Sequence, residues 1–95
     1  MKVKVEVFGS LREVMGWKSI EVELSEDSTL GQLLELLVEQ KPEVRELIFE
    51  GGELKDYLKV LVDGRDCRLL GGLKAKLNDL SIVSIFPPAG GGMEA

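Results

Sequence analysis

The chain has 95 residues, of which 44% are hydrophobic and 31% charged, and this is the size and composition of one soluble globular domain. Its net charge of −5, with no stripe of lysine or arginine, disfavours binding to a nucleic-acid backbone and suits a partner with a basic cleft. No apolar run approaches the roughly 20 residues that span a bilayer, and the N-terminus lacks a signal peptide's apolar stretch, so we expect a cytoplasmic protein without membrane contact.

The first two predicted elements are strands joined by a longer loop. Valines alternate with charged residues over residues 3–7, which is the period-two pattern of a half-buried strand, and the same period returns over residues 18–24. Residues 11–15 have the length of a helical turn, which Gly16 would end. We therefore expect the two strands to form a hairpin.

The next predicted element is the main helix. Thr29 and Gln32 have the spacing of a capping box, in which each side chain satisfies an unpaired backbone donor. Apolar side chains then recur at helical spacing and place a stripe on one face: Leu30, Leu33, Leu34, Leu37 and Val38. A proline disfavours helix at the residue before it, so we expect the helix to end near Gln40 and Pro42 to open a second helical stretch through Ile48.

The second half of the chain contains shorter elements. We expect a loop over residues 49–57, which contain a pair of glycines, and then a strand over residues 58–62. An Asp-Gly pair at residues 63–64 predicts a tight turn into a further strand at residues 66–70. An apolar run predicts the final strand at residues 82–86.

This order of elements predicts an α+β fold with a mixed sheet packed on one main helix. The helix must bury its leucines against the apolar face of the sheet, because no other element is long enough to cover them. The last strand can pair in parallel beside the first, because the helical crossover leaves room for that topology.

The chain has one cysteine, Cys67, and no histidine. One thiol cannot form an internal disulfide, and the lack of histidine excludes Ser-His and Cys-His nucleophile pairs and most transition-metal sites. We expect Cys67 to be a small packing residue in a strand-like stretch rather than a nucleophile. The sequence thus indicates no catalytic residue and no metal site, and a protein that is not an enzyme by itself.

The end of the chain is its most informative segment. Two prolines at residues 87–88 follow the last strand and end it, because proline has no backbone N–H to donate. Three glycines stand at residues 90–92, and a chain without Cβ atoms is slender enough to thread a narrow channel. A frayed terminus is the alternative for such an end. We expect a domain over residues 1–88 and a flexible glycine-rich tail over residues 89–95.

Four stretches of the chain carry a family resemblance, in order and over nearly the full length. They are VEVFGSLREVMG at residues 5–16, STLGQLLELL at residues 28–37, VLVDGRD at residues 60–66 and VSIFPPAGGG at residues 83–92. In these stretches the chain resembles the ubiquitin-like sulfur-carrier family, which has the β-grasp fold, and within it the small subunit of molybdopterin synthase. The thiamine sulfur carrier and the archaeal ubiquitin-like small modifiers are related to that subunit.

The resemblance implies chemistry at a C-terminal glycine. In that family a partner enzyme related to ubiquitin-activating enzymes uses ATP and Mg²⁺ to adenylate the glycine carboxylate, and a sulfur donor converts it to a thiocarboxylate. The tail then enters the large subunit of molybdopterin synthase and gives its sulfur to a pterin precursor of the molybdenum or tungsten cofactor. By resemblance the activated end is Gly92 with Gly91 beside it, or Gly91 with Gly90, and the carrier itself binds no cofactor.

Two departures from the family pattern stand out. The family usually has an acidic-glycine-acidic turn before its last strand, where this chain has Asp79, Leu80 and Ser81, and we expect this turn to be structural. Members that carry sulfur normally end on the two glycines, whereas residues 93–95 follow Gly92 here. We expect a processing protease to remove them.

Alternatives stay open for the function and for the residues that flank the sheet. A ubiquitin-like modifier would join the same carboxylate to lysines of target proteins, and a bare binding domain would keep the fold with a blocked tail. Phe8, Phe86, Pro87 and Pro88 are candidates for a partner-docking patch, with core packing as the alternative for the phenylalanines. The Arg-Glu pair at residues 12–13 matches the family motif, and a local charge pair explains it equally well.

Overall fold

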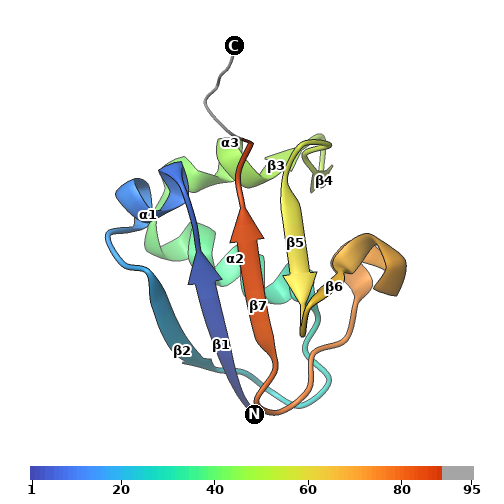
Figure 1. Cartoon of the computed structure of the whole chain (residues 1–95). Helices are drawn as coiled ribbons and strands as arrows, with labels where there is room; N and C mark the ends of the chain where they lie inside the picture. The colour runs from blue at the N-terminus through green and yellow to red at the C-terminus, as the bar shows by residue number, and fades with distance from the viewer. Residues whose placement is uncertain (89–95) are drawn as a thin grey trace.

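A mixed sheet forms one layer of the molecule, and the main helix lies across one of its faces (Figure 1). The strands of the sheet are β1 Lys2–Val7, β2 Ser19–Glu23, β5 Lys59–Val62, β6 Arg65–Asp66 and β7 Ile82–Phe86. This computed structural model describes residues 1–88, and over them the strand order is β2-β1-β7-β5-β6. β1 and β7 run in parallel, and the other neighbours are antiparallel. The predicted β-grasp fold is confirmed.

β1 and β2 form the predicted antiparallel hairpin, with α1 (Ser10–Met15) between them. In β1, Val3, Val5 and Val7 are fully buried, and the side chains that alternate with them face the opposite side of the sheet. Gly16 ends α1 in the left-handed conformation, at φ 85°. A Cβ is disfavoured in that conformation, so the glycine acts as the helix stop that the sequence predicted.

The main helix is α2 (Leu30–Gln40), with the bounds expected from its capping box and the following proline. Oγ1 of Thr29 accepts from the N–H of Gln32 at 3.3 Å, and the N–H of Thr29 donates to Oε1 of Gln32 at 2.8 Å. Every apolar residue of the predicted stripe is buried in the core beneath the sheet. The chain continues through a 3₁₀ turn, η1 (Pro42–Val44), into α3 (Arg45–Ile48), which confirms the second helical stretch.

Residues 49–57 are not the plain loop that the sequence predicted. They contain a small hairpin of β3 (Phe49–Glu50) and β4 (Glu53–Leu54), which turns through Gly51 and Gly52 at φ 61° and 83°. Strands this short cannot display a period-two pattern, so alternation could not reveal them. The glycines that indicated a loop are the turn residues of this hairpin.

The strand predicted at residues 66–70 is wrong over most of its length. β6 ends at Asp66, and the chain then forms a 3₁₀ helix, η2 (Cys67–Leu70). The side chain of Asp66 caps this helix by accepting from the N–H of Arg68 at 2.9 Å, and Gly71 ends it in the left-handed conformation at φ 105°. Local capping by the aspartate therefore outweighs the strand-like sequence pattern.

The turn before β7 is structural, as expected. Oδ1 of Asp79 accepts from the N–H of Lys2 at 2.8 Å, which ties the turn to the start of β1. Oγ of Ser81 donates to Oδ2 of Asp63 at 2.9 Å and joins it to the turn that follows β5. Between them Leu80 adopts φ 69°, and 72% of its surface is exposed. Glycine favours this conformation, which gives a physical reason for the glycine of the family pattern.

Leu80→Gly is therefore expected to stabilise the fold by about 0.5–1 kcal/mol. The substitution removes the strain of a Cβ at positive φ, and it loses little apolar burial because Leu80 is already mostly in solvent. Urea unfolding measures the change in the free energy of unfolding. Asp27→Gly is the matched control, since Asp27 has φ 67° but aspartate tolerates that conformation, and its gain should be smaller. A loss of stability in Leu80→Gly would contradict the strain.

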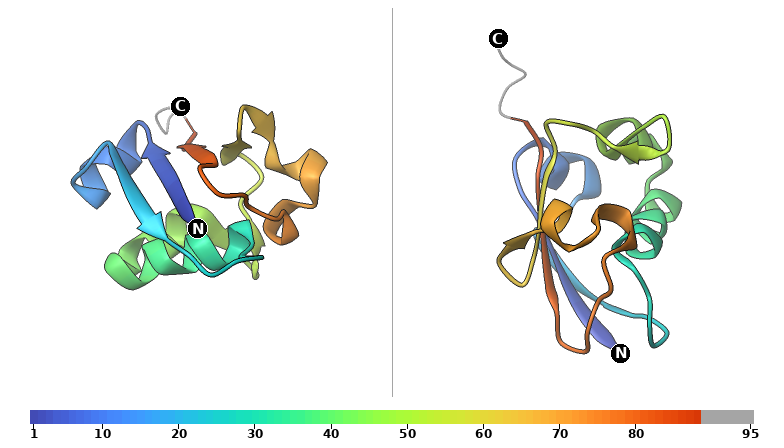
Figure 2. Two further views of the ribbon diagram at one scale, coloured as in Figure 1. Left: turned by 90° about the horizontal axis from the view of Figure 1, so that it is seen from below. Right: turned by 90° about the vertical axis from the view of Figure 1, so that its right-hand side faces the viewer.

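The helices α2 and α3 lie on one side of the sheet, and no helix within residues 1–88 covers the opposite face (Figure 2). β7 ends at the end of the sheet opposite to Met1 (Figure 1). Within residues 1–88, no helix has the length and apolar character needed to cross a membrane. The predicted tail, residues 89–95, lies outside the described residues, so the division into domain and tail stays a prediction.

Candidate functional site

The predicted docking residues gather where β1 and β7 end side by side (Figure 1). The two strands pair in parallel with Val7 opposite Ile85, and the N–H of Phe8 donates to the carbonyl oxygen of Ile85 at 3.1 Å. Phe8 follows β1 directly, and Phe86 is the last residue of β7. The parallel register thus brings residues from opposite ends of the sequence to the same end of the sheet.

Phe8 and Phe86 stack face to face, with ring centroids 4.3 Å apart and ring planes 8° from parallel. Both side chains are half-buried, and their positions alternate with the buried residues of the two strands. They therefore lie on the open face of the sheet and outside the core cluster, which removes the alternative of core packing. Docking of a partner on this pair stays a prediction.

Arg12, on α1, completes this aromatic surface. Its guanidinium carbon lies 4.8 Å from the centroid of the Phe8 ring, and its Nε donates to the carbonyl oxygen of Val7 at 2.7 Å. A cation over an aromatic face contributes about 0.5–1 kcal/mol at an exposed site. From the sequence, Arg12 could be either a residue of the family motif or one half of a local charge pair. In the structure its contacts are with Phe8 and Val7, so it belongs to the same surface as the aromatic pair. We call the surface made by these side chains the exit patch: Phe8, Arg12 and Phe86.

The chain leaves the sheet next to the exit patch. Pro87 is half-buried and Pro88 is exposed. Pro87 lies beside Gly9, which is in the loop between β1 and α1, and a Cβ added to Gly9 would be 3.2 Å from Cγ of the proline ring. The glycines at residues 90–92, the predicted activation site, lie outside the described residues.

Cys67 is fully buried, as expected for a packing residue, although it lies in η2 and not in a strand. Burial raises the pKa of its thiol above the ordinary value, and the attraction of the neighbouring Arg68 opposes this shift. The thiolate is the reactive form of cysteine, so burial and a raised pKa both make this thiol a poor nucleophile.

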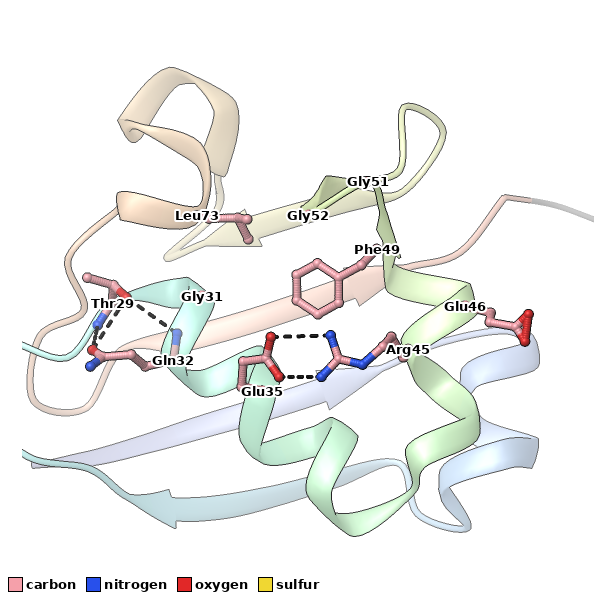
Figure 3. Close-up of a pocket in the computed structure, with 10 residues that line it drawn as sticks. All are labelled: Thr29, Gly31, Gln32, Glu35, Arg45, Glu46, Phe49, Gly51, Gly52 and Leu73. Atoms are coloured by element: carbon pink, nitrogen blue, oxygen red, sulfur yellow. Dashed lines mark hydrogen bonds and ion pairs between the residues drawn. The ribbon is translucent and has the colours of Figure 1, made fainter.

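A pocket of about 480 Å³ lies on the helix side of the molecule (Figure 3). Its walls come from α2, α3, the β3–β4 turn and η3 (Gly72–Lys74). Arg45 donates to both carboxylate oxygens of Glu35, at 2.7 and 3.5 Å, and its guanidinium carbon lies 5.6 Å from the centroid of the Phe49 ring. Both charged side chains are about half exposed, so this ion pair contributes less than about 1 kcal/mol. The pocket shares no residue with the exit patch.

Comparison with known proteins matches the chain over nearly its whole length. The ThiS family profile covers residues 5–92. Small archaeal modifier protein 3 of Haloferax volcanii is 36% identical over 92 residues, which are 97% of this chain and 100% of the relative. A Pyrococcus furiosus protein assigned as molybdopterin converting factor, subunit 1, has a TM-score of 0.77 and 29% identity, with 94% of this chain and 99% of that one covered. A chain of the BexX/CysO complex of Amycolatopsis orientalis has a TM-score of 0.82 and 25% identity, covering 95% and 99%.

The family match covers all three residues of the exit patch and the glycines at residues 90–92. The two solved structures share the fold described above. The names of the similar proteins include a protein modifier and a molybdopterin factor. The chain therefore belongs to the ThiS family and is a ubiquitin-like protein of the sulfur-carrier or modifier type.

Proposed function

We propose that this chain is a sulfur carrier for molybdopterin synthesis and that its activated group is the carboxylate of Gly92. The observation that carries the proposal is the extent of the family match, which ends at Gly92. It is supported by the similarity to a protein assigned as molybdopterin converting factor, subunit 1. The fold is consistent with this role, because β7 leads directly into the two prolines that precede the glycines.

The proposed chemistry needs a partner, because a free carboxylate is a poor electrophile. The Gly92 carboxylate attacks the α-phosphorus of Mg²⁺-bound ATP in an adenylating enzyme, pyrophosphate leaves, and an acyl-adenylate forms. A sulfide equivalent from a donor then displaces AMP and leaves a thiocarboxylate. The carrier supplies the carboxylate and a slender chain, since glycines fit a channel in which a Cβ would clash. General acids and bases, and the ATP site, belong to the partner.

The exit patch is the proposed docking surface for the adenylating enzyme and for the large subunit of molybdopterin synthase. Two stacked phenylalanines offer a rigid apolar anchor, and Arg12 beside them offers a directed hydrogen-bond donor. Pro88 is exposed at the edge of this surface and extends it toward the tail. Because the exit patch lies close to Pro88, docking there would fix the distance between the bound surface and the enzyme's active site that the glycines must span.

Protein modification is the second candidate function, and the similarity to small archaeal modifier protein 3 favours it. The same acyl-adenylate would then be passed on until the ε-amine of a target lysine attacks the acyl carbon and forms an isopeptide bond. Both functions use one fold, one activation step and one glycine, so the exit patch serves either of them.

Intact mass spectrometry of the protein from its native cells tests the proposal. We expect a chain that ends at Gly92 and carries sulfur in place of one carboxylate oxygen. Target peptides with a glycine remnant on lysine, without any thiocarboxylate, would establish the modifier instead. A chain that keeps residues 93–95 in every fraction would contradict both functions and leave a binding domain.

Cys67→Ala is expected to carry as much sulfur as the unsubstituted protein, because the proposed sulfur is attached to the C-terminal carbonyl and the thiol is buried. The variant should lose about 1 kcal/mol of stability as a small core truncation. Thiocarboxylate formation with the cognate adenylating enzyme is the measurement, and a chain that ends at Pro88 is the negative control. Loss of all transfer in a folded Cys67→Ala protein would make Cys67 the sulfur site and overturn the proposal.

A further inference from the structure

A pocket of about 380 Å³ lies at the end of the sheet where β7 begins, away from the exit patch (Figure 1). Its walls come from β5, β6 and the turn between them, η2, η3 and the segment that follows η3. Three cationic side chains and a single carboxylate line it: Arg65, Lys74, Lys76 and Asp63. The whole chain has a net charge of −5, so this lining differs in sign from the molecule as a whole. We call it the basic pocket.

The two lysines stand on a wall that is fixed to the start of α2. Lys74 and Lys76 are exposed, whereas Ala75 between them is 1% exposed and belongs to the core. The N–H of Leu30, the first residue of α2, donates to the carbonyl oxygen of Ala75 at 2.8 Å, and Lys76 forms a β-bridge with Thr29. The backbone that carries the two cations is therefore held in place by the fold.

The third cation and the carboxylate come from the β5–β6 turn. Arg65 is the first residue of β6 and pairs with Val62 of β5. Oδ1 of Asp63 accepts from the N–H of Ile82 at 2.8 Å, and its Oδ2 accepts from Oγ of Ser81 at 2.9 Å. Both oxygens of this carboxylate thus have donors of their own, and they join the turn to the start of β7.

The three cations have little compensation from carboxylates of residues 1–88. Over these residues, no carboxylate oxygen lies within 4 Å of a side-chain nitrogen of Arg65 or Lys74. Lys76 comes within 3.9 Å of Asp27, but the two side chains are 68% and 84% exposed, so this pair contributes little. Like charges around one cavity repel one another and lower the stability of the fold. An anion bound among them would remove this repulsion.

We propose that the basic pocket binds a small molecule that bears phosphate. The planar guanidinium of Arg65 matches two oxygens of a phosphate group, and the lysines add charge for a dianion. The pocket volume falls within the range of small-molecule sites, about 300–1,000 Å³, so the pocket has room for more than a bare phosphate ion. A long polyanion such as a nucleic acid is disfavoured by the net charge of the chain. This site goes beyond the proposed function, because it needs no chemistry at Gly92.

Titration of the full chain with three probes tests the pocket: sodium phosphate, sodium pyrophosphate and AMP. Two-dimensional NMR follows the backbone amides while sodium chloride keeps the ionic strength constant, so that general screening does not change. We expect saturable shifts that centre on residues 64–66 and 74–78. Pyrophosphate and AMP distinguish an oligophosphate from a nucleotide by which of them binds more tightly, and either order supports the site. Shifts that do not saturate for any probe up to about 10 mM would overturn it.

Arg65→Gln and Lys74→Gln should each weaken binding of the tightest probe about fivefold, and the double variant should weaken it about 25-fold. Lys41→Gln is the matched control, since it removes the same charge from an exposed residue outside the pocket, and its effect should stay below about twofold. Thermal unfolding gives a second readout: the probe should raise the Tm of the unsubstituted chain more than that of the double variant. Equal weakening in Lys41→Gln, or an unchanged affinity in the double variant, would overturn the site.

Discussion

A chain that ends at Gly92 is expected to be adenylated at least about 100-fold faster than a chain in which residues 93–95 follow. Adenylation needs a carboxylate at the end of the glycine segment, and in the longer chain the Gly92 carbonyl is tied up in a peptide bond. The carboxylate of Ala95 lies three residues too far along, behind two side chains that do not suit a channel shaped for glycines. Glu94 adds a charge that would have to be desolvated there. Residues 93–95 would thus act as a gate on activation.

The comparison uses the two chains with the same adenylating enzyme and Mg²⁺-ATP, and it follows pyrophosphate release together with the intact mass of each chain. A chain that ends at Pro88 is the control, because it keeps the exit patch and lacks the glycines: it should compete for the enzyme without reacting. Equal rates for the two chains, with the mass of the longer one unchanged before the reaction, would refute the gate.

Leu33→Ala and Leu37→Ala are each expected to lower the free energy of unfolding by about 2–5 kcal/mol. The two side chains are 0% and 1% exposed and lie on the face of α2 that packs against the sheet. Truncation removes buried methyl groups and leaves a cavity that the surrounding β-strands close only in part. Small domains have a total stability of about 5–15 kcal/mol, so either change removes a large share of it. Urea unfolding followed by circular dichroism measures the loss.

Leu69→Ala is the matched control for these core truncations, because it deletes the same atoms from a side chain that is 80% exposed. It should change the free energy of unfolding by less than about 0.5 kcal/mol. Values that small for both core variants as well would mean that the leucine stripe does not pack on the sheet, and the architecture described here would be wrong.

Elements with a local cause were predictable from the sequence. The capping box at Thr29, the proline after α2 and Gly16 at the end of α1 each act on residues within one turn of themselves, and all three operate as expected. The predictions from the sequence were wrong at two short elements. The β3–β4 hairpin is too short to show a period, and a side-chain cap at Asp66 turned an expected strand into η2.

The sequence by itself determined a single α+β domain, the order of its main elements and the family resemblance of its glycine-rich end, because each depends on neighbouring residues or on short recognisable stretches. Only the tertiary structure decided that Phe8 stacks on Phe86, that Arg12 covers the Phe8 ring and that Pro87 lies beside Gly9. Phe8 and Phe86 are far apart in the sequence, and so are Gly9 and Pro87. Alternation in a strand specifies which side chains face the core, but a shift of two residues preserves that pattern, so the register of β1 against β7 had to come from the packed sheet.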